Sequence, residues 1–131
     1  RITVSNRQTI DSETDTIEET AYGNYTEKNG KQYITYKTEN DGDKISSMIK
    51  IDGNEILIKR TGSVNSSMTY KVDTKKEFLY HLPYGTVPME IETQRIVSKL
   101  DENGGTIELV YTLMVQGEKY FNDMKITVSK R

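Results

Sequence analysis

Alternation of apolar and polar positions with a period of two dominates the sequence. Its clearest stretch is residues 107–115, and the same period recurs in residues 45–51 and 64–72. This pattern is typical of strands that turn one face toward a core, and no segment combines a 3.6-residue period with helix caps. We therefore predict an all-β protein in which Glu108 and Thr112 face water and the interior receives Ile107, Leu109, Tyr111, Leu113 and Val115.

Short glycine-containing turns join the predicted strands. Asn29-Gly30, Asp41-Gly42 and Asp52-Gly53 separate four runs rich in Tyr, Ile and Thr. Asn-Gly and Asp-Gly readily adopt the positive φ that two-residue hairpin loops need. Gly23 interrupts the strand predicted for residues 16–27, which indicates a bulge or a sharp bend at a barrel corner.

Two later irregularities bend the predicted sheet. In residues 89–100 the apolar set changes phase near Ile96, as a β-bulge would produce, and Pro83 and Pro88 cannot donate ladder hydrogen bonds. The hairpin connections predict an antiparallel up-and-down meander of eight to ten strands that forms a closed or nearly closed barrel, because closure removes unpaired edges. A β-sandwich is the alternative, but it usually needs longer crossover loops.

Length and composition limit the classes of protein to which this chain can belong. The 131 residues predict a single domain over residues 1–131. The sequence has no Cys, which excludes disulfides and thiolate catalysis and agrees with a reducing cytosol. No apolar run approaches the roughly 20 residues of a membrane helix, and no signal-peptide pattern is present. We expect a cytoplasmic protein with no membrane partner. Because the sequence begins at Arg1 rather than Met, removal of a signal peptide stays open.

The charge distribution argues against nucleic-acid binding. With 18 basic and 20 acidic residues the net charge is −2, whereas nucleic-acid binding normally needs a concentrated basic face. Residues 11–19 carry five acidic side chains and no basic one. Acids at alternate strand positions share a face and would suit a cation, but no calcium-loop spacing follows. We interpret this segment as a solvated hairpin connection that discourages edge pairing.

Several segments occur in an order that carries a family resemblance. They are GNYTEKNGKQYITYK, IKIDGNEILIKRTGSVNSSMTY, YHLPYGTVPMEI, DENGGTIELVYTL and NDMKITV. From about residue 23 to 128 the chain thereby resembles the DUF1934 family. The resemblance implies a calycin-like or lipocalin-like barrel of about eight strands in a cytoplasmic bacterial protein, and no known activity. The chain has no Trp for a lipocalin Gly-x-Trp motif and no Arg-x-Tyr pair near its end, so no lipophilic ligand follows.

Two arginines are candidates for holding an anion. Arg60 continues the alternation of Ile56 and Ile58. If that face is interior, its guanidinium lies at the barrel mouth and can bind a carboxylate or phosphate through two hydrogen bonds. The alternatives are an internal ion pair with a carboxylate such as Glu77 or Glu92, and an arginine that reaches solvent along its own stem. Arg95 presents the same choice on the strand of residues 89–100.

The remaining candidates are one histidine and a group of aromatic and sulfur-containing residues. His81, the only histidine, could act as a general base or metal ligand, but zinc and iron sites usually need several His or Cys. We therefore expect no metal, no cofactor and no enzymatic activity. The side chains that could line a pocket, with plain core packing as the alternative, are Tyr36, Met68, Tyr80, Tyr84 and Tyr111.

These observations predict a non-enzymatic barrel that binds a small anionic or amphipathic molecule at its mouth. The site is predicted near Arg60, His81 and Tyr84, with Tyr36, Met68, Arg95 and Tyr111 as further candidates. The alternative is a protein-interaction or assembly module whose barrel is filled and binds no ligand. We expect a monomer or homodimer. The sequence names neither a ligand nor a protein partner.

Overall fold

Two antiparallel sheets make up the protein. The computed structural model describes residues 1–10 and 12–129, with the backbone alone at Asn40 and Leu82. In this part of the chain there are eleven strands and no helix that could span a membrane. Sheet A has the order β2-β1-β11-β10-β9-β8 and sheet B the order β3-β4-β5-β6-β7. The strands are β1 (Ile2–Ile10), β2 (Glu13–Ala21), β3 (Gly23–Lys28), β4 (Lys31–Asn40), β5 (Asp43–Asp52), β6 (Glu55–Gly62), β7 (Ser66–Lys71), β8 (Lys75–Leu82), β9 (Gly85–Asp101), β10 (Gly104–Val115) and β11 (Glu118–Ser129).

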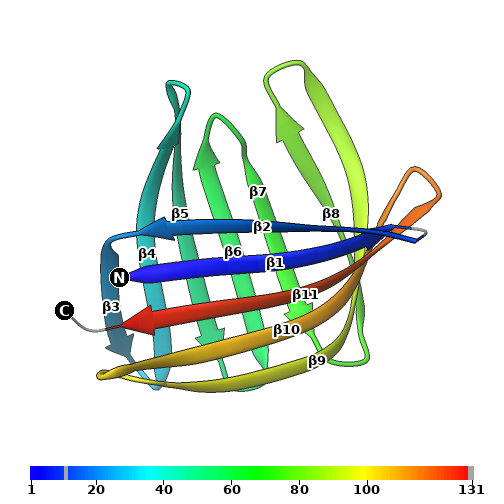
Figure 1. Cartoon of the computed structure of the whole chain (residues 1–131). Coiled ribbons are helices and arrows are strands. Elements are labelled where there is room, and N and C mark those ends of the chain that lie inside the picture. The colour runs from blue at the N-terminus through cyan, green and yellow to red at the C-terminus, as the bar shows by residue number, and fades with distance from the viewer. Residues whose placement is uncertain (11, 130–131) are drawn as a thin grey trace.

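The sheets run across one another and enclose the core between them (Figure 1). At one corner the chain passes directly from β2 to β3, and at the opposite corner Asn65 pairs with His81 to link β7 and β8. This arrangement confirms the predicted antiparallel barrel-like fold. The buried apolar side chains come from both sheets and are Ile2, Val4, Ile34, Tyr36, Ile49, Ile51, Ile56, Ile58, Met68, Tyr70, Ile91, Ile107, Leu109, Tyr111, Met124 and Ile126.

The predicted turns form where the sequence places them. Asn29 and Gly30 have φ values of 55° and 77°, and Asp41 and Gly42 have values of 53° and 84°. Positive φ at both central residues is the geometry of a type I′ hairpin, whose twist matches that of the strands. The third hairpin is displaced by one residue, because Asp52 pairs with Glu55 and the two central residues are Gly53 and Asn54.

Gly23 permits the sharp bend that the sequence predicted. A Cβ at this position would overlap the Thr35 carbonyl oxygen and lie 2.6 Å from Ile2 Cδ1. Glycine alone lacks this atom, so the backbone of β3 can approach β4 closely at the corner. The bend divides the strand predicted for residues 16–27 into β2 and β3, which is one reason why the structure has eleven strand segments where about eight were predicted.

A β-bulge explains the change of phase near Ile96. Val110 pairs with Arg95 while Tyr111 pairs with Thr93, so Gln94 is the extra residue in β9. Because of this bulge, the predictions for Arg95 and Thr112 are wrong. It leaves Arg95 exposed on the outer face, away from the mouth. Thr112 was predicted to face water but is only 8% exposed. Its hydroxyl oxygen accepts a hydrogen bond from Nε2 of the bulged Gln94 at 3.2 Å.

The acidic segment forms a strand, which corrects its interpretation as a hairpin connection. Residues from Glu13 onward belong to β2 at the edge of sheet A, where every residue pairs with β1. The acidic side chains thus line a sheet edge, where charge opposes pairing with another chain. Asp11, which also belonged to the predicted connection, lies outside the described residues. No three acidic or histidine side chains gather into a metal-binding group in the described ranges.

Candidate functional site

A row of polar side chains crosses the inner face of sheet B. In register, Tyr36 of β4 lies opposite Ser47 of β5, Ser47 opposite Arg60 of β6, and Arg60 opposite Ser66 of β7. Directly paired residues in antiparallel strands share a face. Since Tyr36, Ser47 and Ser66 are buried, the row faces the interior, as the alternation of Arg60 with Ile56 and Ile58 predicts.

A second polar row crosses the inner face of sheet A. Its members in register are Gln8, Asn122, Tyr111 and Thr93. Asn122 Oδ1 accepts hydrogen bonds from Gln8 Nε2 at 3.0 Å and from Asn6 Nδ2 at 3.2 Å. This row is therefore partly satisfied by its own hydrogen bonds.

Two tyrosines connect the sheets. The rings of Tyr70 on β7 and Tyr111 on β10 meet edge to face, with centroids 4.8 Å apart and an interplanar angle of 65°. This is a favoured arrangement of aromatic pairs. It brings the two polar rows to the same region of the interior.

Several buried polar atoms in this region have no hydrogen-bonding partner among the described residues. They belong to side chains of which none is more than 6% exposed, namely Tyr36, Ser47, Ser66 and Thr93. A buried hydroxyl without a partner costs about 1–3 kcal/mol. The Arg60 side chain is half-buried, and no ion pair or side-chain hydrogen bond joins its guanidinium to another described residue. The interior thus holds hydrogen-bonding capacity that the chain itself leaves unused.

The electrostatics keep this cluster positively charged. Burial lowers the pKa of Arg60, but Tyr36, Tyr70, Tyr111 and Glu19 raise it, and its pKa ends above the ordinary value. The guanidinium is therefore protonated at any accessible pH. Burial also raises the pKa of Tyr111 and raises that of Tyr70 strongly, while Arg60 lowers both to a smaller extent. Both hydroxyls stay protonated at neutral pH and can act as donors.

This burial predicts a loss of stability in alkali. Above pH of about 10 the unfolded chain releases tyrosine protons that Tyr70 and Tyr111 retain in the folded state, so stability falls as pH rises. In urea melts at pH 9 and pH 11, Tyr70→Phe should show a smaller loss than the wild type. Tyr84→Phe is the control, because Tyr84 is 85% exposed. Equal losses in all three proteins would contradict the expectation.

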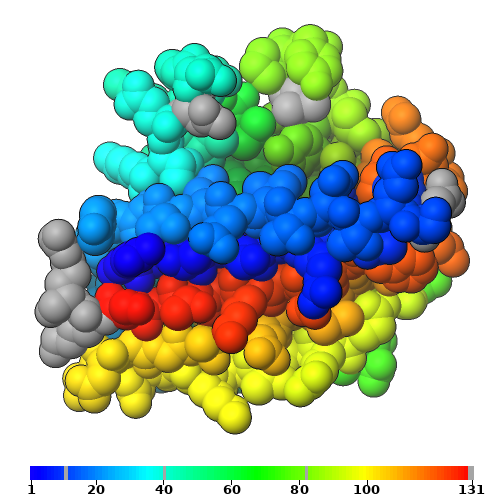
Figure 2. Space-filling view, in the orientation of Figure 1, coloured from blue at the N-terminus to red at the C-terminus, as the bar shows by residue number. Residues whose placement is uncertain are grey.

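The interior opens along β2. Asp15, Ile17 and Glu19 lie opposite Gln8, Asn6 and Val4 of β1, so these three share the inner face. Ile17 is nevertheless 66% exposed, whereas Val4 on the same face is buried. Figure 2 shows the surface hollowed above β2, between the β4–β5 and β8–β9 hairpins. We call this opening, with Arg60 on its inner side and Asp15, Ile17 and Glu19 on its outer side, the mouth.

Comparison with known proteins identifies the family. The family model described as "Domain of unknown function (DUF1934)" matches residues 2–128. The chain belongs to the DUF1934 family. Among curated proteins it is similar to the uncharacterized beta-barrel protein YwiB of Bacillus subtilis (strain 168), with 29% identity over 118 residues, 89% of this chain and 83% of that protein. The crystal structure of YwiB superposes with a TM-score of 0.89 and 27% identity, covering 96% of this chain and 87% of that one. These similarities support the barrel fold and assign no activity.

The structure of this DUF1934 protein brings four of the seven candidate residues together. Tyr36, Met68 and Tyr111 are buried on the interior faces that also carry Arg60. His81 and Tyr84 belong to the β8–β9 hairpin, which the Asn65–His81 pairing places beside the start of β7. Their side chains are exposed, and His81 Nδ1 lies 3.1 Å from Thr86 Oγ1 rather than near Arg60. Arg95, as noted above, is on the outer face.

Sequence reasoning missed the polar members of the two rows. Polar residues stand on strand faces that are otherwise apolar at Ser47, Ser66, Thr93 and Asn122, and also at Asn6 and Gln8 of β1. A polar residue that interrupts an alternating apolar face was the available signal. Arg60 forms no ion pair with Glu77 or Glu92, which were proposed as its alternative partners. Glu92 Oε2 lies 3.7 Å from Lys75 Nζ instead, and Glu77 is exposed.

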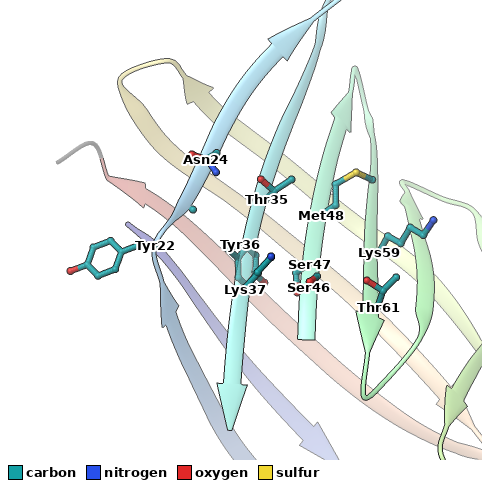
Figure 3. Close-up of a pocket in the computed structure, with 11 residues that line it drawn as sticks. Tyr22, Asn24, Thr35, Tyr36, Lys37, Ser46, Ser47, Met48, Lys59 and Thr61 are labelled. Atoms are coloured by element: carbon teal, nitrogen blue, oxygen red, sulfur yellow. The ribbon is translucent and has the colours of Figure 1, made fainter. Parts of the chain in front are cut away.

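A second hollow lies on the outer face of sheet B. It has a volume of about 470 Å³, and Figure 3 shows Lys37, Met48 and Lys59 among its lining residues. Both lysines are exposed, as is usual for the solvent face of a sheet. The interior cluster is the stronger candidate in this DUF1934 protein, because a cation and unpaired buried hydroxyls come together there.

Proposed function

We propose that this DUF1934 protein is a non-enzymatic binder of a small anionic or amphipathic molecule, which it holds at the mouth through Arg60. One observation carries the proposal. Arg60 is a permanent cation on the interior face, has no ion pair among the described residues, and lies in register between two buried serines.

The residues around Arg60 suit an anion. The planar guanidinium offers a fork of N–H donors that matches a carboxylate or phosphate. Ser47 and Ser66 flank Arg60 on the two neighbouring strands, so their hydroxyls can donate to the same group. A bound anion would offset the desolvation of the cation. Ile17 and the half-buried Ile45 offer apolar contact to the rest of the molecule.

The same residues favour binding over catalysis. General acid–base chemistry needs a group whose pKa lies near the working pH. In this cluster the shifted groups are Arg60, Tyr70 and Tyr111, and each stays protonated at neutral pH. The site therefore supports recognition of a charge. A cytoplasmic location and a monomeric or homodimeric state remain predictions.

Native mass spectrometry of freshly purified protein tests the proposal. We expect the wild type to retain a small molecule and Arg60→Met to lose it, because methionine fills similar space without the charge. Lys59→Met is the matched control, since Lys59 lies next to Arg60 on the opposite, exposed face of β6. It should retain the molecule.

Thermal melts of the same variants separate the proposal from its alternative. If Arg60 serves binding, Arg60→Met should leave the melting temperature of the ligand-free protein unchanged or raise it, because it removes an unpaired interior cation. A melting temperature lower by several degrees, together with no retained molecule in the wild type, would contradict the proposal. That result would favour a filled barrel that acts as an interaction module.

A further inference from the structure

The mouth carries opposite charges on its two sides. Arg60 lies on the sheet B side, and Asp15 and Glu19 lie on the inner face of β2. Residues 13–21 contain no basic side chain. Among the described residues neither Asp15 nor Glu19 takes part in an ion pair, and Glu19 is close enough to Arg60 to influence its charge equilibrium.

The two sides also differ in burial. The Arg60 side is lined by the buried hydroxyls of Tyr36, Ser47 and Ser66, which have no hydrogen-bonding partner in the part of the chain that the structure describes. On the β2 side, Asp15 and Glu19 are exposed. A guest that fills the mouth would thus have one polar end inside the barrel and the other in contact with water.

A simple anion fits only half of this arrangement. It is attracted by Arg60 but repelled by the carboxylates of β2, and both interactions act over several ångströms at a partly exposed site. A molecule that also carries a positive group is attracted by both sides. An ammonium is strongly hydrated, so it suits the exposed side of the mouth.

We infer that the ligand is zwitterionic, with its carboxylate or phosphate directed to Arg60, Ser47 and Ser66 and its amino group directed to Glu19 and Asp15. This inference rests on the proposed function, because it assigns a ligand class to the same site. It adds a specificity role for the acidic strand β2.

Matched probes test the charge preference. The probes are butanoate, hexanoate and octanoate, each paired with its ω-amino derivative, titrated into ¹⁵N-labelled protein and followed by NMR. At the best-fitting length the amino derivative should bind about twofold to fivefold more tightly than the parent acid, which is what one exposed ion pair contributes. Glu19→Gln should abolish this advantage and tighten binding of the parent acid.

Glu18→Gln is the matched control, because Glu18 precedes Glu19 and lies on the outer face of β2. It should preserve the preference. Equal affinities within every probe pair, or equal effects of the two substitutions, would overturn the zwitterion inference while leaving an Arg60-dependent binder intact. A drop of several degrees in the melting temperature of ligand-free Glu19→Gln would also overturn it, since Glu19 would then be the counterion of Arg60. If no probe binds and Arg60→Met changes nothing, the proposed function fails as well.

Discussion

Replacing Leu109 by alanine is expected to lower the free energy of unfolding by about 2–5 kcal/mol. Leu109 is completely buried and lies between Met124 of β11 and Ile96 of β9 in the central part of sheet A. Removing its isobutyl group takes apolar contacts from both neighbouring strands and leaves a cavity that tightly packed side chains cannot fill.

Glu108→Ala is the matched control for this substitution. Glu108 is adjacent in β10 but lies on the outer face, opposite Lys125. Substitutions on the outer face of a sheet usually change stability little, so the expected loss is below about 0.5 kcal/mol. Urea unfolding of both variants, followed by far-ultraviolet circular dichroism, gives the two values. Equal losses, or a greater loss for Glu108→Ala, would contradict the assignment of inner and outer faces.

Gly23→Ala is expected to destabilise the protein by about 1–3 kcal/mol or more, although it adds a single methyl group. The added Cβ would meet the carbonyl oxygen of Thr35, a backbone atom held in the β3–β4 ladder, and would lie 2.9 Å from Tyr36 Cβ. Relief of this overlap must displace β3 from β4 at the corner where the chain passes between sheets.

Asn24→Ala tests whether the effect belongs to Gly23 alone. Asn24 is the next residue of β3, is exposed, and pairs with the same Thr35. Its replacement should cost less than about 0.5 kcal/mol in the same urea melts. If Gly23→Ala were as mild as Asn24→Ala, the corner would be able to relax, and the close packing of β3 on β4 would not require glycine.

Local patterns in the sequence were sufficient to predict the strands and most of the turns. A period of two in residues 107–115 identifies a strand with one apolar face, and Asn29-Gly30 identifies a hairpin through its backbone preference. Gly23 and the phase change near Ile96 predicted a bend and a bulge, and the structure has both. These features depend on neighbours within a few residues, so they can be read without knowledge of the fold.

The site, by contrast, was decided by the tertiary structure. Alternation shows that Arg60 shares a face with Ile58. It does not show that Ser47 and Ser66 lie beside Arg60 and that Tyr36 lies next to Ser47, since pairing across β4–β7 sets that row. The bulge at Gln94 determined that Arg95 points outward.

The acidic outer side of the mouth depends on contacts between segments that are far apart in the sequence. β2 carries Glu19 to the mouth only because the chain bends at Gly23 and β1 pairs with both β2 and β11. An alternation with a period of two shows which residues share a face of one strand. It does not state which faces will meet, because that depends on the register of strands far apart in the sequence and on how two sheets pack around one core.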